Sequence, residues 1–144
     1  MTIKGSCLCG GVRFELFEPP ALMGACHCSR CRKAGSAAYL YVRAEALHWL
    51  AGRALLTRYK PRPPFRFTRT FCKRCGTAFG DPETGRVVAI AASCLDDDPG
   101  VRAAFHEYAP DEAPWSPGCF DAPYSPNEKG RRPEGRRPSR KQEG

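Results

Sequence analysis

The sequence predicts a mainly β protein made of many short strands, in which bound metal replaces part of the hydrophobic core. Apolar residues recur at every second position, which is the period of a half-buried strand. Glycine, proline and aspartate interrupt these runs after a few residues, as expected for turns between strands. Seven of the nine cysteines gather in three short clusters, an arrangement typical of metal ligands.

The predicted strands cover residues 3–7, 12–16, 21–28, 36–43, 47–50, 54–60, 65–72, 77–80, 86–93 and 104–109. The first two form a hairpin around the glycine-containing turn 9–11. The prolines at 19–20 end this hairpin, because proline cannot donate a hydrogen bond to a strand ladder. The third strand leads directly into the central cysteine cluster.

A single helical turn is predicted over residues 30–34. Ser29 is the expected N-cap, and Gly35 can end the turn because glycine readily adopts the left-handed conformation found there. The strand that follows is predicted to have two apolar faces. Ala38, Leu40 and Val42 lie on one face, and Tyr39 and Tyr41 on the other.

Residues 47–50 and 54–60 are predicted to form a hairpin with Gly52 at its turn. Helix propensity favours a helix over 44–50 instead, but the segment is short and strand-like runs lie on both sides of it. The proline-rich stretch 60–64 is expected to be a stiff, extended connector.

The second half of the chain contains another predicted hairpin, with 81–85 as the turn. Residues 87–92 are apolar on both faces, so this strand is expected at the centre of a sheet. After the last strand, residues 110–126 form an arm punctuated by prolines.

The expected domain organisation is a metal-binding domain over 1–126 and a disordered basic tail over 127–144. The tail contains no large apolar residue, so it cannot bury enough surface to offset the entropy of ordering. Of the net charge of +8, the segment 129–144 carries +5, with seven basic and two acidic residues, which leaves +3 for the rest of the chain.

A cytoplasmic location is expected, with no membrane association. The longest apolar run, residues 87–92, is too short for a transmembrane span or a signal peptide. In a reducing compartment, nine cysteines indicate metal ligation rather than disulfides.

The two outer cysteine pairs are predicted to form one closed zinc site. Cys7 and Cys9 are two residues apart in an extended segment, so both thiols point the same way. Cys72 and Cys75, followed by Gly76, form the C-x-x-C-G pattern of a zinc knuckle. Four thiolates saturate a tetrahedral zinc ion, so this site is expected to be structural.

The central cluster Cys26, Cys28 and Cys31 is predicted to hold a second zinc ion. Three protein ligands leave one position open, which is typical of catalytic zinc. His27 could fill that position, but strand alternation turns its side chain away, and we expect it to be a packed or surface residue. Three thiolates give the zinc site a net negative charge, which favours a soft thiolate over water as the open-site ligand.

The residues around the central cluster allow more than one interpretation. Arg30, Arg32 and Lys33 could hold the carboxylates of a small anionic thiol, or could simply form a solvated helix face. Cys94 is expected to be a small buried residue, with a role as an occasional fourth ligand as the less favoured alternative. Cys119 is expected to be a free thiol.

Three segments together resemble the glutathione-dependent formaldehyde-activating enzyme family, which also includes centromere protein V. These are Ser6–Phe14, Cys26–Arg32 and Cys72–Thr77, and the later segments 95–97 and 106–115 are similar to the closing part of that family. The resemblance implies an Mss4-like β fold, a structural zinc on Cys7, Cys9, Cys72 and Cys75, and a second zinc on Cys26, Cys28 and Cys31. It also implies glutathione and formaldehyde as substrates in a reaction of the carbon–sulfur lyase type.

A non-catalytic function is the alternative. The chain would then be a zinc-stabilised binding module, and its basic tail would contact protein or, weakly and in a salt-dependent way, nucleic acid. Zinc content and thiol binding at the central cluster discriminate between these two hypotheses.

Overall fold

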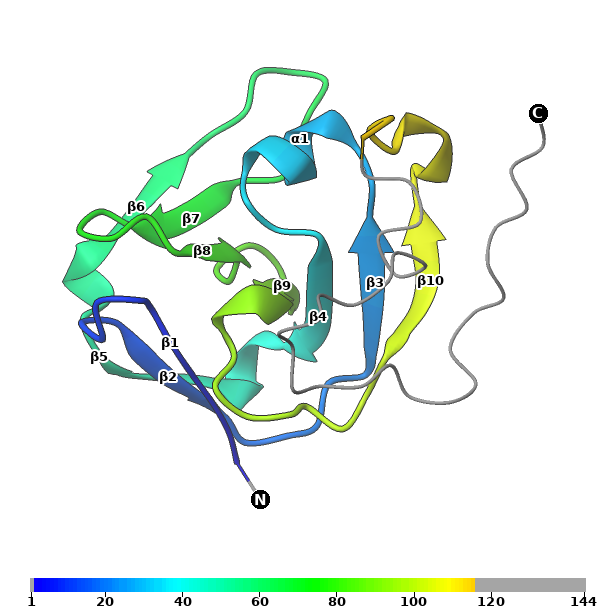
Figure 1. Ribbon diagram of the computed structural model, residues 1–144. Coiled ribbons are helices and arrows are strands. Elements are labelled where there is room, and N and C mark those ends of the chain that lie inside the picture. The colour runs from blue at the N-terminus through cyan, green and yellow to red at the C-terminus, as the bar shows by residue number, and fades with distance from the viewer. Residues whose placement is uncertain (1, 116–144) are drawn as a thin grey trace, which may run out of the picture. The chain divides into compact units, whose positions relative to one another are not determined.

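The computed structural model describes residues 2–115, which contain ten strands, one short α-helix and four 3-10 turns (Figure 1). The strands are β1 (Ile3–Ser6), β2 (Arg13–Leu16), β3 (Leu22–Cys26), β4 (Ala38–Arg43), β5 (Leu47–Ala51), β6 (Leu56–Tyr59), β7 (Arg69–Cys72), β8 (Ala78–Asp81), β9 (Val87–Ala91) and β10 (Ala103–Glu107). The helix α1 covers Ser29–Lys33, and the 3-10 turns η1 to η4 cover Ala44–Ala46, Arg53–Leu55, Ala92–Cys94 and Ala109–Asp111. The predicted mainly β class is therefore confirmed.

The strands form two sheets. One sheet has three strands in the order β1-β2-β5, and the other has seven in the order β10-β3-β4-β9-β8-β7-β6 (Figure 1). Every pair is antiparallel except β10 with β3, which is parallel and shows a register shift between Ala103 and Phe105. All ten strands lie in the compact unit Met1–Asp111.

The two faces of the seven-stranded sheet have different surroundings. On β4, Leu40 and Val42 are almost fully buried in the main core, which also contains Phe14, Phe79 and Ile90. Tyr39 and Tyr41 lie on the opposite face, in a second cluster with Cys26, Cys31, Ala89 and Ala91. The alternation predicted for this strand is thus confirmed, and it places the central cysteines on the face away from the main core.

Several predicted elements are confirmed. The hairpins β1–β2 and β8–β9 form as expected, and β9 lies between β4 and β8, as its two apolar faces indicated. The predicted helical turn forms as α1, and Gly35 follows it with a φ of 78°.

The predicted hairpin of residues 47–60 is wrong. β5 pairs with β2 and β6 pairs with β7, so the two strands belong to different sheets. The chain changes sheet through Gly52, whose φ is 74°, and the 3-10 turn that follows it. The strand expected from residue 65 begins only at Arg69, because a turn in which the Phe65 amide donates to the Arg62 carbonyl oxygen at 3.1 Å precedes it.

The N-cap of α1 is also different from the prediction. Cys28, not Ser29, is the N-cap, and its sulfur accepts a hydrogen bond from the Cys31 amide at 3.3 Å. A side-chain acceptor at this position satisfies one of the unpaired amides of the first turn. The cap therefore fixes two of the three central cysteines relative to each other.

Within residues 2–115, no helix combines the length and apolar character needed to cross a membrane. The predicted domain boundary near residue 126, the basic tail and Cys119 lie outside the described residues.

The turn at Gly52 allows a test of how the two sheets are connected. A Cβ atom at Gly52 would lie 1.9 Å from the Gly11 carbonyl oxygen, whereas one at Gly100 would meet nothing within 4 Å. Both glycines have positive φ, at 74° and 75°. We therefore expect Gly100→Ala to lower the free energy of unfolding by about 1–2 kcal/mol, the strain of a left-handed residue, and Gly52→Ala to lower it by clearly more.

Denaturant unfolding of both variants measures this difference. Gly100→Ala is the matched control, because it introduces the same backbone strain without the collision. Equal losses of stability would contradict the close approach between residues 52 and 11.

Candidate metal centres

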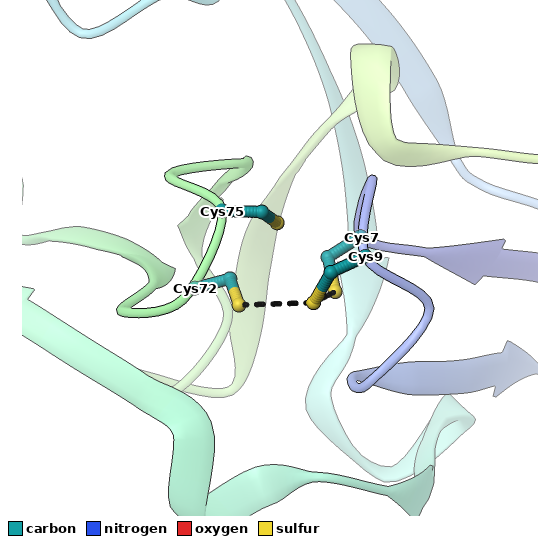
Figure 2. Close-up of side chains that lie close together, drawn as sticks. All are labelled: Cys7, Cys9, Cys72 and Cys75. Atoms are coloured by element: carbon teal, nitrogen blue, oxygen red, sulfur yellow. Dashed lines mark hydrogen bonds between the residues drawn. The ribbon is translucent and has the colours of Figure 1, made fainter.

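The outer cysteines come from the two sheets and meet at one point. Cys7 and Cys9 lie in the loop after β1, and Cys72 and Cys75 lie at the end of β7 and in the turn after it. Figure 2 shows their side chains pointing toward one another from these two loops. All four sulfur atoms lie within 4.8 Å of one another.

The distances between these sulfur atoms fit a tetrahedral zinc ion. Zn–S bonds of about 2.3 Å place the sulfurs of a tetrahedron about 3.8 Å apart, and the Cys7–Cys9 and Cys9–Cys72 distances are 3.4 and 3.9 Å. A disulfide needs S–S contact near 2.05 Å, and every described cysteine is a free thiol. The donor set is therefore compatible with zinc.

Hydrogen bonds to sulfur support the thiolate form in this cluster. The Thr77 hydroxyl lies 3.3 Å from the Cys75 sulfur, and together with the Thr77 amide it lowers the pKa of Cys75 to about 5. The Val12 amide donates to the Cys7 sulfur at 3.2 Å. For Cys9, the Gly11 amide favours the thiolate, but the neighbouring thiols outweigh it and raise the pKa to about 11. Four thiolates at this spacing therefore require a cation between them.

The central cysteines form a second group with one donor fewer. Cys26 ends β3, Cys28 caps α1 and Cys31 lies within α1, and their sulfurs are all within 4.8 Å of one another. Cys26 and Cys31 are buried, and Cys28 is half-buried. Soft donors at this spacing suit zinc, as in the outer cluster.

The central thiols are also electrostatically coupled. Burial is the largest cause that raises the pKa of Cys26, to about 12, and the neighbouring thiols of Cys28 and Cys31 add to it. Burial also disfavours the Cys28 thiolate, but the Cys31 amide and the other two thiols outweigh it and lower its pKa. As in the outer cluster, three simultaneous thiolates need a compensating positive charge.

The neighbouring histidine and the extra cysteine lie outside this donor set. His27 faces β10, where its Nε2 lies 2.8 Å from Nδ1 of His106 and the two rings stack. Cys94 is buried in the main core, and its thiol donates to the Ala91 carbonyl oxygen at 3.1 Å. Both positions agree with the interpretations favoured from the sequence.

The central cysteines line a cavity of about 890 Å³ on the second face of the seven-stranded sheet. Its wall includes Tyr39 and Tyr41 from β4, Phe67, and Arg69 from β7. A second cavity, of about 480 Å³, shares Arg30, Tyr39 and Arg69 with this one. The outer cysteines line neither of these two cavities. Within residues 2–115, the two clusters therefore differ in the number of sulfur donors, and only the central one lines the larger of these two cavities.

Two polar residues of this cavity were not identified from the sequence. The Arg69 guanidinium donates to the Tyr39 hydroxyl at 3.0 Å and lies 3.6 Å from the Cys31 sulfur. Arg69 lies two positions from Phe67 and Phe71, and this spacing was available in the sequence. Its contacts with Tyr39 on β4 and Cys31 in α1 are long-range and were not.

The basic residues near the central cluster divide into two sets. Arg30 lines both cavities and Lys33 lines the smaller one, whereas Arg32 lines neither cavity. Arg30 also stacks on Phe65, with its guanidinium carbon 3.8 Å from the ring centroid.

The chain is similar to one protein family and to individual proteins of known sequence or structure. The family model described as glutathione-dependent formaldehyde-activating enzyme matches residues 2–115. A Halomonas elongata protein named putative glutathione-dependent formaldehyde-activating enzyme is 35% identical over 107 residues, covering 68% of each chain. A crystal structure of a Rhodobacter sphaeroides protein superposes with a TM-score of 0.53 at 27% identity, covering 69% of this chain and 90% of that one.

Zinc analysis of single variants tests the division between the two clusters. We expect two zinc ions per chain in the wild type and one in Cys28→Ser. Cys28→Ser should stay folded, because its cluster joins neighbouring segments. Cys72→Ser should unfold, because structural zinc supplies about 10–16 kcal/mol in small zinc domains, whereas domains are stable by only about 5–15 kcal/mol.

Cys94→Ala is the control, and it should retain both zinc ions. Metal content by atomic emission and folding by circular dichroism measure these outcomes. Unfolding of Cys28→Ser to the same extent as Cys72→Ser would show that the central cluster is structural.

Proposed function

Since the chain belongs to the glutathione-dependent formaldehyde-activating enzyme family, we propose that it is a zinc enzyme that adds glutathione to formaldehyde. The sulfur of the thiol forms a bond to the carbonyl carbon, the C=O π bond breaks, and the proton of the thiol ends on the oxygen. The product is S-(hydroxymethyl)glutathione, and in the opposite direction the reaction is that of a carbon–sulfur lyase.

The observation that carries this proposal is the difference between the two cysteine clusters. Cys7, Cys9, Cys72 and Cys75 supply four donors, whereas Cys26, Cys28 and Cys31 supply three beside a cavity of about 890 Å³. When bound by three thiolates, zinc offers an open position that suits a soft sulfur and keeps it deprotonated. The closed cluster would hold the two sheets together, and the open one would carry the chemistry.

Arg69 and Tyr39 are the residues that we assign to the oxygen of the aldehyde. Addition of a thiolate to a carbonyl places negative charge on that oxygen, and fixed donors stabilise it. The Tyr39 oxygen accepts a hydrogen bond from Arg69, so its own proton can be donated either to the neighbouring Cys31 sulfur or to the aldehyde oxygen. Burial is the largest cause that raises the pKa of Tyr39, and it keeps the phenol in the neutral, donating form.

The activity itself can be measured by following the formation of S-(hydroxymethyl)glutathione from glutathione and ¹³C-formaldehyde by NMR exchange. We expect the zinc-loaded protein to accelerate exchange above the uncatalysed rate, and Cys28→Ser to return it to that rate. Cys94→Ala should remain active, which controls for the general loss of a thiol. No acceleration by the folded, zinc-loaded wild type would contradict the proposal.

Tyr39→Phe tests the role of the phenol. We expect kcat to fall by about 10²–10³-fold, the effect of removing one donor from a developing oxyanion, with KM for glutathione nearly unchanged. Two zinc ions per chain should remain, since Tyr39 is in neither donor set.

Tyr41→Phe is the matched control. Tyr41 lies on the same face of β4 and lines the same cavity, but within residues 2–115 the phenol that is hydrogen-bonded to Arg69 is that of Tyr39. An equal fall in kcat for both variants would contradict the assignment to Tyr39.

A further inference from the structure

Charge is divided unevenly along the described chain. Residues 53–74 contain eight basic residues and no Asp or Glu, whereas residues 81–115 contain eight acidic residues and two arginines. The basic stretch includes β6, β7 and the connector 60–68 between them, and β7 and β6 are the last two strands at one side of the seven-stranded sheet. A concentration of positive charge therefore lies at this side of the sheet.

The connector 60–68 brings part of this charge next to α1 (Figure 1). The guanidinium carbon of Arg30 in α1 lies 3.8 Å from the centroid of the Phe65 ring in the connector. The Phe65 amide donates to the Arg62 carbonyl oxygen at 3.1 Å, which closes a turn and holds these two residues close together. We refer to the following residues as the basic–aromatic surface: Arg30, Tyr59, Lys60, Arg62, Phe65 and Arg66.

The cations of the connector are exposed and lack carboxylate partners. Arg53 and Arg58 form ion pairs with Glu83. Within residues 2–115, by contrast, no carboxylate lies within the 4.0 Å ion-pair distance of Lys60, Arg62 or Arg66. Exposed charges of one sign without counterions attract a polyanion.

Two aromatic rings lie exposed among these cations. Tyr59 is 54% exposed and Phe65 is 51% exposed. Exposed rings beside cations suit a single-stranded nucleic acid, because its unpaired bases stack on the rings while its phosphates meet the positive charges. An acidic polypeptide would use the cations and leave the rings without planar partners. The bases of a duplex are already stacked on one another, so the rings favour a single strand.

We propose that the basic–aromatic surface binds single-stranded nucleic acid. Lys60, Arg62 and Arg66 contact phosphates, and bases stack on Tyr59 and Phe65. This interaction goes beyond the proposed function and does not depend on it, because Lys60 and Arg62 line neither cavity. It also differs from the weak contact through the basic tail that was considered from the sequence, because it belongs to the described part of the chain.

Fluorescence anisotropy of a fluorescein-labelled oligothymidylate, titrated with the zinc-loaded full chain at several salt concentrations, tests the role of charge. We expect the affinity to fall as salt rises, because binding releases counterions from the phosphates. Arg62→Gln should reduce the slope of log affinity against log salt by about 0.7, the contribution of one phosphate contact to a single strand. Arg13→Gln is the matched control, because it removes an exposed positive charge from β2 in the other sheet, and the slope should not change.

Phe65→Leu tests the role of stacking. The variant keeps an apolar side chain but removes the ring, and we expect affinity for the oligothymidylate to fall about fivefold or more, the effect of losing one aromatic stacking partner. Phe17→Leu is the matched control, because Phe17 is 48% exposed and lies outside the basic–aromatic surface. Its affinity should equal that of the wild type, and both variants should retain two zinc ions per chain.

The remaining outcomes would overturn the proposal. Equal effects of Arg62→Gln and Arg13→Gln would show that net charge or the tail, which is the same in both variants, accounts for binding. Unchanged affinity of Phe65→Leu would exclude stacking on this ring. Competition by polyglutamate as effective as competition by unlabelled oligothymidylate at equal charge would assign the surface to an acidic polypeptide, and equal affinity for a DNA duplex would exclude recognition of unpaired bases. Absence of binding by the folded, zinc-loaded wild type would also contradict the proposal.

Discussion

Repulsion between closely spaced thiolates is the constraint on which the rest of this structure depends. Each cysteine cluster gathers sulfur atoms within 4.8 Å, and neither can be fully ionised without a cation at its centre. In the outer cluster, one pair of ligands comes from the three-stranded sheet and the other from the seven-stranded sheet. A zinc ion there would connect the two sheets, and metal binding would be coupled to folding.

Because side chains alternate along its strands, the seven-stranded sheet has one face in the main core and the opposite face at the larger cavity. The face that carries Leu40, Val88 and Ile90 packs into the main core. The opposite face carries Tyr39, Tyr41 and Ala89 and lines the larger cavity. The cap of Cys28 on α1 and the position of Cys26 at the end of β3 then place the central cysteines at that cavity.

The sequence was sufficient for most of the strands, for α1 and for the cysteine clusters, although it misplaced the N-cap of α1 and the start of β7. Alternation predicted the two faces of β4, and ligand spacing predicted both groups of sulfurs that the structure brings together. Long-range pairing was not accessible in the same way: residues 47–60 read as a hairpin because each strand has a suitable pattern, but that pattern does not specify the partner. Arg69 and Tyr39, 30 positions apart, were missed for the same reason.

Zinc-edge X-ray absorption of the loaded protein, with and without glutathione, tests the central claim most directly. Without the thiol, the two sites should give four and three sulfur neighbours. With glutathione, the second site should gain a sulfur, and the mean number of sulfur neighbours per zinc should rise to four. An unchanged number of sulfur neighbours under saturating glutathione would contradict thiol chemistry at Cys26, Cys28 and Cys31.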